Sequence, residues 1–255
     1  MKKVSYAVFR IVRFIVKAVY PKTEFRGTEN LPDEAFIAVG NHAQMNSPIV
    51  CELYFPRPSR TWTAGEMMDI KEVQAYSYKD FWSYKPKYIR WFYKLLSYVA
   101  APIAVSIFNN AKCIGVYHDG RIIGTFRNTV NALTEGESVV ILPENYTPYN
   151  NLIWDFSDRF VDVGSMYYKK TGKEISFVPM YVAPAFKSVY FGKPVKYNHN
   201  EKKESERKRI CRARKEGITE IAVNLPEHTV VPYPNMSRKD YPTNRDVKEV
   251  GNETN

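Results

Sequence analysis

The sequence predicts an α/β fold: one domain with a largely parallel mixed sheet flanked by helices, preceded by an amphipathic N-terminal helix. Two observations support this fold class. Short apolar runs alternate along the chain with segments of helical periodicity, which is typical of strand–helix units. The apolar runs are also nearly continuous, as expected of strands buried on both faces. With 255 residues, 44% hydrophobic and 15% aromatic, the chain can bury one good-sized core.

The predicted strands are the apolar runs. They are expected at 35–40, 112–117, 138–142, 176–182 and 188–192, with a further short strand at 60–64. Helices are expected at 121–135, 159–171 and 201–222, and another opens at Ser47-Pro48 and runs to about Leu53. In that last helix Ser47 is predicted as the N-cap and Pro48 as the first helical residue. Gly136 and Gly172 are the expected ends of the helices at 121–135 and 159–171, respectively.

The N-terminal segment, residues 1–22, combines a basic stripe with an apolar face. Its charges are Lys3, Arg10, Arg13 and Lys17, set between Val, Ile and Phe residues. Its longest charge-free run is about six residues, far below the roughly 20 that a membrane span needs. The pattern favours a helix lying in a membrane interface. The alternative is a helix packed on the domain with its charges solvated.

The rest of the chain is assigned to one domain and a tail. Residues 23–225 are assigned to the α/β domain, and the aromatic and lysine-rich stretch 66–94 is interpreted as an insertion within it, largely helical. The apolar run 95–108 contains Pro102 and, at about 14 residues, is predicted to be too short to span a membrane. The tail 226–255 shows no periodicity and is predicted to be poorly ordered.

Charge and cysteine content narrow the partners and the compartment. A net charge of +10 favours an anionic partner, such as a membrane surface, nucleic acid or a phosphorylated substrate. Nucleic acid is not expected, because the basic residues of 201–222 alternate with glutamates and no nucleic-acid-binding motif is present. The three cysteines form no C-x-x-C pair, which argues against a disulfide framework or zinc site and favours a reducing cytoplasm.

His42 is the first candidate for chemistry. It follows Asn41 directly after the apolar run 35–39, and Ser47 stands five residues later. A histidine at the mouth of a sheet can accept a proton from a substrate hydroxyl. Glu144 gives a second signal, because it follows the strand 138–142, and strand carboxyl ends are where α/β sheets place their sites. Taken alone, His42 has the alternative of a satisfied core or surface histidine.

Four sequence blocks occur in the order of a known family. They are Asn41-His42 with Ser47, then 114–118 (Ile-Gly-Val-Tyr-His), 142–147 (Leu-Pro-Glu-Asn-Tyr-Thr) and Val178-Pro179. The lead-in 25–32 reads Phe-Arg-Gly-Thr-Glu-Asn-Leu-Pro. Together these blocks resemble the glycerolipid acyltransferase family, whose type member acylates 1-acylglycerol-3-phosphate. The resemblance covers roughly residues 5–225 and indicates a divergent member.

The resemblance implies a reaction and its participants. A fatty acyl group would move from acyl-CoA or acyl carrier protein to the hydroxyl of a lysophospholipid, with His42 as general base and with no metal or cofactor. The implied location is the cytoplasmic face of the cell membrane, held peripherally (monotopically) on an anionic surface. His42 and Ser47 take the catalytic positions; the substrate-binding positions are Asn41, Glu144, Asn145, His118 and Arg121.

The departures from the family pattern bear on activity. The family aspartate is Ser47, which cannot supply a negative charge to an imidazolium; in serine hydrolases the loss of that charge costs on the order of 10⁴ in rate. The family glycine is Asn145, which tolerates positive φ. His118 and Thr147 replace two phosphate-binding arginines. Arg121 and Lys112 are the candidates to compensate, and the alternative is that these basic residues are merely solvated. The alternative function is a catalytically weak or inactive member that binds lipid at the membrane.

Overall fold

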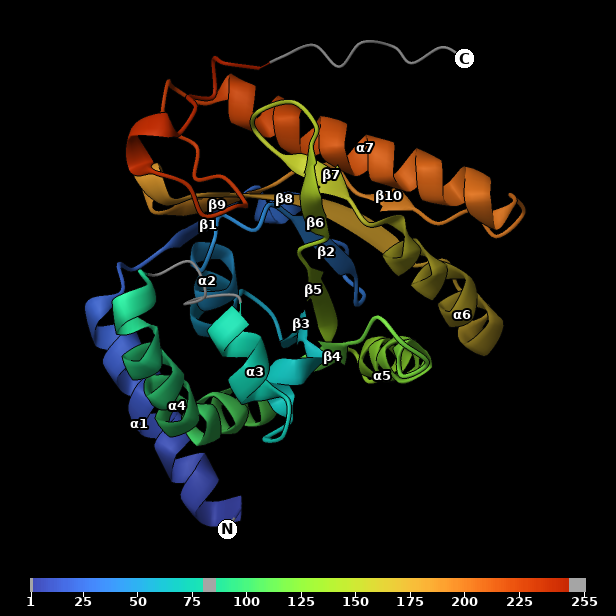
Figure 1. Cartoon of the computed structure of the whole chain (residues 1–255). Helices are drawn as coiled ribbons and strands as arrows, with labels where there is room; N and C mark the ends of the chain where they lie inside the picture. Colours follow the sequence, from blue (N-terminus) through green and yellow to red (C-terminus); the bar gives the residue numbers. More distant parts are fainter. Residues whose placement is uncertain (1, 80–85, 248–255) are drawn as a thin grey trace. The chain divides into compact units, whose positions relative to one another are not determined.

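The computed structural model describes residues 2–79 and 86–247, and it divides into two compact units. The first unit comprises Met1–Pro21 and Arg60–Asn128, and the second comprises Lys22–Ser59 and Thr129–Asn255. Figure 1 shows the chain coloured from blue at its N-terminus to red at its C-terminus.

The second unit is built on a mixed sheet. Its strands follow the order β1 (Glu24–Arg26), β9 (Ser188–Phe191), β8 (Ser176–Ala183), β2 (Ile37–Gly40) and β5 (Ser138–Ile141). The pairs β1–β9, β8–β2 and β2–β5 are parallel. The pair β8–β9 is antiparallel, as is the pairing of the short β10 (Val195–Lys196) with β8. The predicted largely parallel sheet is therefore confirmed.

Helices cover both faces of this sheet at β8. On one face, Cys51 of α2 (Asn46–Tyr54) lies with its Sγ 4.0 Å from Sδ of Met180. On the other, α7 (Lys203–Asn224) approaches so closely that a Cβ built on Gly217 would lie 3.2 Å from Cγ of Pro179. Neighbouring residues of a strand point to opposite faces, so α2 and α7 flank the sheet and the predicted α/β class is confirmed.

The remaining regular elements are short or lie at the edges. The helix α6 (Asp162–Thr171) ends at Gly172, whose φ of 70° is the left-handed conformation predicted for a helix stop. Short 3₁₀ helices occur at Thr28–Asn30, Gly65–Met68, Lys87–Ile89, Asp158–Val161, Pro184–Phe186 and Arg238–Asp240.

A hairpin absent from the sequence prediction carries Glu144. Its antiparallel strands are β6 (Glu144–Pro148) and β7 (Trp154–Phe156). Within its turn, Oδ1 of Asn150 accepts hydrogen bonds from the backbone N–H groups of Leu152 and Ile153 at 3.2 and 3.1 Å. Side-chain hydrogen bonding of this kind replaces a backbone turn, so the hairpin forms from a polar stretch without strand-like alternation.

The first unit is mainly helical. It contains α1 (Lys2–Val19), α3 (Val73–Ser77), α4 (Arg90–Asn110) and the parallel pair β3 (Ser59–Ala64) and β4 (Ile114–Val116). The helix α5 (Ile122–Thr134) runs from this unit into the second. The N-terminal end of α1 packs on the C-terminal end of α4, where Oγ of Ser5 lies 3.0 Å from Oγ of Ser106.

The helix that contains the apolar run 95–108 is longer than that run, because it spans Arg90–Asn110. It takes in the preceding aromatic residues, and the segment Lys87–Asn110 is, by length and composition, sufficient to cross a membrane. Pro102 lies inside α4 without ending it. The predicted length of about 14 residues was therefore too short. Residues 80–85 of the predicted insertion 66–94 lie outside the described residues.

The C-terminal segment, residues 226–247, differs from the predicted poorly ordered tail. Asn244 is fully buried and donates from Nδ2 to the carbonyl oxygen of Ala222 at the end of α7. Val230 donates its backbone N–H to the carbonyl oxygen of Pro242, which closes the segment on itself. Polar anchoring of this kind leaves no periodic signal in a sequence. The tail beyond residue 247 lies outside the described residues.

Candidate active site

Asn41 directly follows β2, and its side chain continues the hydrogen bonding of the sheet. Nδ2 of Asn41 donates to the carbonyl oxygen of Val182 at 3.1 Å, and Oδ1 accepts from the backbone N–H of Val182 at 2.7 Å. The buried amide thus pairs with β8 as another strand residue would. Gly40 precedes it, at a point where a Cβ would lie 2.9 Å from the carbonyl oxygen of Met180. Asn41 therefore fixes the place where the chain leaves the sheet.

The next residues form a tight turn with a left-handed backbone. Ala43 and Gln44 have φ values of 43° and 54°, although neither is glycine. Such residues cost about 1–3 kcal/mol each and are retained where the surroundings over-determine them. The carbonyl oxygen of Ala43 accepts hydrogen bonds from both the backbone N–H and the side chain of Asn46. The turn directs the carbonyl group of Gln44 back toward His42.

His42 has one ring nitrogen engaged by that turn. Nδ1 lies 2.6 Å from the carbonyl oxygen of Gln44, and since a carbonyl only accepts, Nδ1 carries the proton. In the neutral ring Nε2 is then the proton acceptor. Burial lowers the pKa of His42 below its usual value, and the hydrogen bond to Gln44 opposes that shift in part. Among the described residues, no Asp or Glu oxygen hydrogen-bonds to either ring nitrogen.

Glu144 contacts His42 through the backbone. Its Oε2 accepts a short hydrogen bond from the backbone N–H of His42, and its Oε1 accepts one from that of Trp154 at 2.8 Å. The buried carboxylate thus has one oxygen bound to the loop after β2 and the other bound to β7. Burial raises the pKa of Glu144 to about 7, against the two hydrogen bonds that lower it. Glu144 therefore ties the His42 loop to the β6–β7 hairpin.

Ser47 is not the N-cap that the sequence predicted. The helix α2 begins at Asn46, with Met45 at the cap position and without a side-chain cap. The turn that starts at Ala43 already closes at Asn46, so the helix begins one residue before Ser47. Ser47 is fully buried, and its Oγ donates to the carbonyl oxygen of Asn41 at 2.7 Å. Its hydroxyl thus braces the Asn41 backbone.

Asn145 lies within β6, whose extended backbone requires no positive φ. The predicted reason for an asparagine at this position, tolerance of a left-handed turn, is therefore wrong. Its Oδ1 instead accepts a hydrogen bond from the backbone N–H of Thr147 at 2.7 Å.

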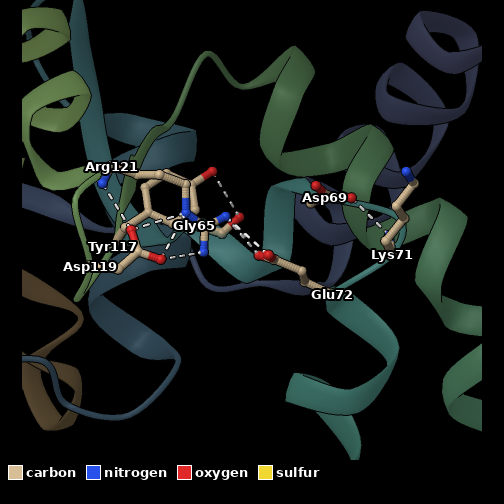
Figure 2. A network of polar contacts seen from close by, with 7 residues as sticks. All are labelled: Gly65, Asp69, Lys71, Glu72, Tyr117, Asp119 and Arg121. Carbon is tan, nitrogen blue, oxygen red and sulfur yellow. Dashed lines mark hydrogen bonds and ion pairs between the residues drawn. The ribbon is translucent and has the colours of Figure 1, made fainter.

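His118 and Arg121 belong to the first unit, and Figure 2 shows Arg121 in a network of polar contacts. Its Nη1 lies 3.0 Å from Oε1 of Glu72, and its Nη2 lies 2.9 Å from Oδ2 of Asp119. The guanidinium carbon stands 4.0 Å from the centre of the Tyr117 ring. His118 is exposed beside Asp119. Arg121 is therefore held by two carboxylates and an aromatic ring.

The backbone supports this network. The ring of Tyr117 covers Gly65, where a Cβ would lie 2.2 Å from Cε1 of Tyr117, so a larger residue would force the ring to move. Asp69 caps the next turn by accepting the backbone N–H of Lys71 at 2.8 Å. The 3₁₀ turn at Gly65–Met68 and the start of α3 thus hold Glu72 in place for Arg121.

The C-terminal segment contributes residues that the sequence reasoning missed. The ring of Tyr233 stands 5.4 Å from that of His42, and 5.1 Å from that of Tyr146. Nε2 of Gln44 donates to the hydroxyl of Tyr241 at 2.9 Å. The available signal was the apolar Val-Val-Pro-Tyr-Pro run at 230–234, which stands out in an otherwise polar tail.

Burial raises the pKa of the Cys51 thiol to about 12, which suits a core residue of α2 and not a nucleophile. Within the described ranges, no group of three or more His, Cys, Asp or Glu side chains is arranged to hold a metal ion.

Comparison with solved structures gave a structural likeness. The chain is similar to the 1-acyl-sn-glycerophosphate (LPA) acyltransferase PlsC from Thermotoga maritima, with a TM-score of 0.49 and 15% sequence identity, over 88% of this chain and 83% of that one. No protein-family model matches the chain, and no curated protein matches it in sequence.

Proposed function

We propose that the chain is an acyltransferase that moves a fatty acyl group from a thioester donor, acyl-CoA or acyl carrier protein, to the hydroxyl of a lysophospholipid. The observation that carries the proposal is the state of His42. Its Nδ1 proton is bound by the carbonyl oxygen of Gln44 and its pKa is lowered by burial, so the ring is a neutral base with Nε2 as its proton acceptor. The four ordered sequence blocks support the same assignment.

The proposed reaction needs only His42 as a proton carrier. Nε2 accepts the proton of the acceptor hydroxyl while its oxygen attacks the thioester carbonyl carbon. The tetrahedral intermediate then collapses with cleavage of the carbon–sulfur bond, and His42 returns the proton to the leaving thiolate. The Gln44 carbonyl offers the imidazolium a dipole where the family has a carboxylate. Holding both substrates in line then supplies much of the rate.

Arg121 is the proposed donor to the acceptor's phosphate, as the sequence resemblance implies. Arg121 is bound to Glu72 and Asp119, but the pairs are solvent-exposed, so a phosphate can compete for the guanidinium. His118 is proposed to contribute a second donor. Asn41, Glu144 and Asn145 then act on the acceptor indirectly, by shaping the loop and hairpin around His42.

A membrane surface is the proposed location, with peripheral attachment at the cytoplasmic face. Large apolar side chains are exposed on both α1 and α4, including Phe14, Ile15, Trp91, Leu95 and Val99. Neither helix contains an acidic residue, whereas both carry Lys and Arg. Exposed apolar side chains beside basic ones suit an interface with anionic lipid.

Acyl transfer tests the proposal directly. Labelled acyl-CoA or acyl carrier protein is offered with a panel of lysolipids to the wild type and to His42→Ala. We expect the variant to lose at least 10²-fold in kcat, since general-base catalysis contributes about 10²–10⁴. His199→Gln is the matched control. His199 pairs with Glu174 near the start of β8, whereas the His42 loop lies near Val182 at the other end of that strand. Equal product from wild type and His42→Ala would refute the general-base role.

Vesicle flotation tests the membrane location. Phe14→Ser with Ile15→Ser removes two exposed apolar side chains of α1, and Trp91→Ser removes one from α4. We expect both variants to bind phosphatidylserine vesicles less than wild type, and all three to bind neutral vesicles weakly. Met236→Ser, which changes an exposed apolar residue of the second unit, is the control. Unchanged binding in both test variants would refute the proposed surface.

A catalytically weak lipid-binding protein is the second candidate, and one observation favours it. The ring of His42 is bonded to a carbonyl, and in the described part of the chain Ser47 is bonded to Asn41 and not to the ring. Ser47→Asp separates the candidates. At least tenfold more acyl transfer than wild type would indicate a weakened acyltransferase centre. Lysolipid binding without turnover in either form would indicate the lipid-binding protein.

A further inference from the structure

We infer that the C-terminal segment, residues 226–247, positions His42 by holding Gln44, and so takes over the orienting role that a carboxylate at position 47 has in the resembled family. The inference rests on the proposed function for its consequence in catalysis. The positioning itself concerns only contacts within the second unit.

The first step is the link between Gln44 and His42. The carbonyl oxygen of Gln44 is the only hydrogen-bond partner of the ring among the described residues, and it lies 2.6 Å from Nδ1. A carbonyl fixes the tautomer and the plane of an imidazole, which a carboxylate would otherwise do. It orients the ring only if the backbone of Gln44 is itself fixed, and that backbone has a φ of 54° in a strained turn.

The second step is what holds Gln44. Its side-chain amide donates to the hydroxyl of Tyr241 at 2.9 Å and points to the carbonyl oxygen of Pro234 at 3.4 Å. Both acceptors belong to the C-terminal segment, about 190 positions away in the sequence. Tyr233 of the same segment packs edge-on against the His42 ring, with 5.4 Å between centroids and 64° between planes. Carbonyl and ring are thus both restrained by one piece of chain.

The third step is the anchoring of the segment. His228 donates from Nδ1 to the carbonyl oxygen of Pro226, so its Nε2 accepts from the hydroxyl of Tyr181, at 2.8 Å, on β8. Asn244 is fully buried and accepts the backbone N–H of His228. These contacts involve neither Gln44 nor His42. The segment therefore has its own attachment to the sheet and to α7, and it can act as a fixed support for the loop.

Nitrogen NMR of ¹⁵N-histidine-labelled protein tests the positioning without requiring activity. His42→Ala assigns the signals of His42. We expect wild type to show the Nδ1–H tautomer at neutral pH, and both Tyr241→Phe and Gln44→Ala to show exchange between the two tautomers. Lys239→Ala changes an exposed residue of the same segment and is the matched control. Thermal unfolding of each variant confirms that it is folded.

Kinetics give the second readout. We expect Tyr241→Phe to lower kcat by about tenfold while leaving KM for the acyl donor within about twofold, because a misplaced base slows chemistry and not binding. The double variant with Gln44→Ala should lose no more than the larger single loss, since both changes break one chain of contacts.

The outcomes separate this inference from the proposed function. A tautomer that responds to Tyr241→Phe in a protein without acyl transfer would uphold the positioning and overturn the function. An active wild type whose tautomer and kcat are unchanged in Tyr241→Phe and Gln44→Ala would overturn the positioning and leave the function standing.

Discussion

The His42–Glu144 region and the Arg121 cluster are both predicted parts of one site, yet they are built differently. Around His42, buried side chains bond to backbone groups: Asn41 to Val182, and Glu144 to His42 itself. Around Arg121, exposed side chains bond to one another. A buried donor that loses its partner cannot turn to water, whereas an exposed ion pair can. Substitutions around His42 should therefore lower both activity and the free energy of unfolding, whereas substitutions around Arg121 should leave the free energy of unfolding unchanged.

The largest expected effect comes from Glu144→Ala. It leaves the backbone N–H groups of His42 and Trp154, which are part-buried, without their acceptor, and each such group costs about 1–3 kcal/mol. We expect the free energy of unfolding in urea to fall by about 2–6 kcal/mol. Glu216→Ala, which removes an exposed carboxylate from α7, is the control and should have little effect. A Glu144→Ala protein as stable as wild type would contradict the difference between the two regions.

The next effect is a pH dependence of stability. The pKa of Glu144 is raised by burial from 4.5 to about 7, so between these values the folded protein holds a proton that the unfolded chain releases. Stability should therefore be highest below about pH 4.5 as far as this group is concerned, and fall as pH rises toward 7 by about 3 kcal/mol. Glu144→Gln cannot titrate and should remove that part of the slope in urea unfolding measured from pH 4.5 to 8. An identical slope in both proteins would show that Glu144 is not responsible.

A smaller effect is expected for Asn41→Ala. The substitution removes the amide that pairs with both backbone groups of Val182, at a position where solvent does not reach. We expect a loss of about 2 kcal/mol in the free energy of unfolding, together with reduced acyl transfer because the exit of the His42 loop is no longer fixed. Normal stability with lost activity would instead make Asn41 a direct substrate contact.

The smallest effect on stability is expected for Arg121→Ala. Its ion pairs are exposed, so the midpoint of unfolding should not change measurably. If the guanidinium meets the acceptor's phosphate as proposed, KM for a phosphate-bearing lysolipid should rise by about two- to tenfold with kcat unchanged. Glu72→Gln frees one side of the guanidinium and should lower the same KM. A loss of stability in Arg121→Ala would mean that this cluster is structural, like the His42 region.

Much of the fold could be predicted because it depends on local pattern. The apolar runs at 35–40, 138–142 and 176–182 coincide with β2, β5 and β8, and glycine ended α6 as expected. The places of His42 and Glu144 at strand ends also followed from the sequence. Their hydrogen bonds did not, because these join residues 102 positions apart through the backbone.

The two errors have different physical causes. Ser47 was predicted as a helix cap from its residue type, but a turn of two left-handed residues closed the loop first. The tail 226–255 was predicted to be poorly ordered because it lacks periodicity, yet buried polar groups such as Asn244 and His228 anchor its described part, residues 226–247. The first error comes from a local turn and the second from long-range polar contacts, and neither leaves a periodic signal in a single sequence.

The hydrogen bond from the backbone N–H of His42 to Glu144 makes the exchange of this amide proton a measure of loop opening. That amide proton can exchange with solvent only when the carboxylate releases it, which requires the β6–β7 hairpin to separate from the β2 loop. The hydrogen-exchange rate of this single amide therefore measures how often the loop comes free. If a bound lysolipid slows that rate by a given factor, the factor reports how much of the ligand's binding energy goes into keeping the base in place.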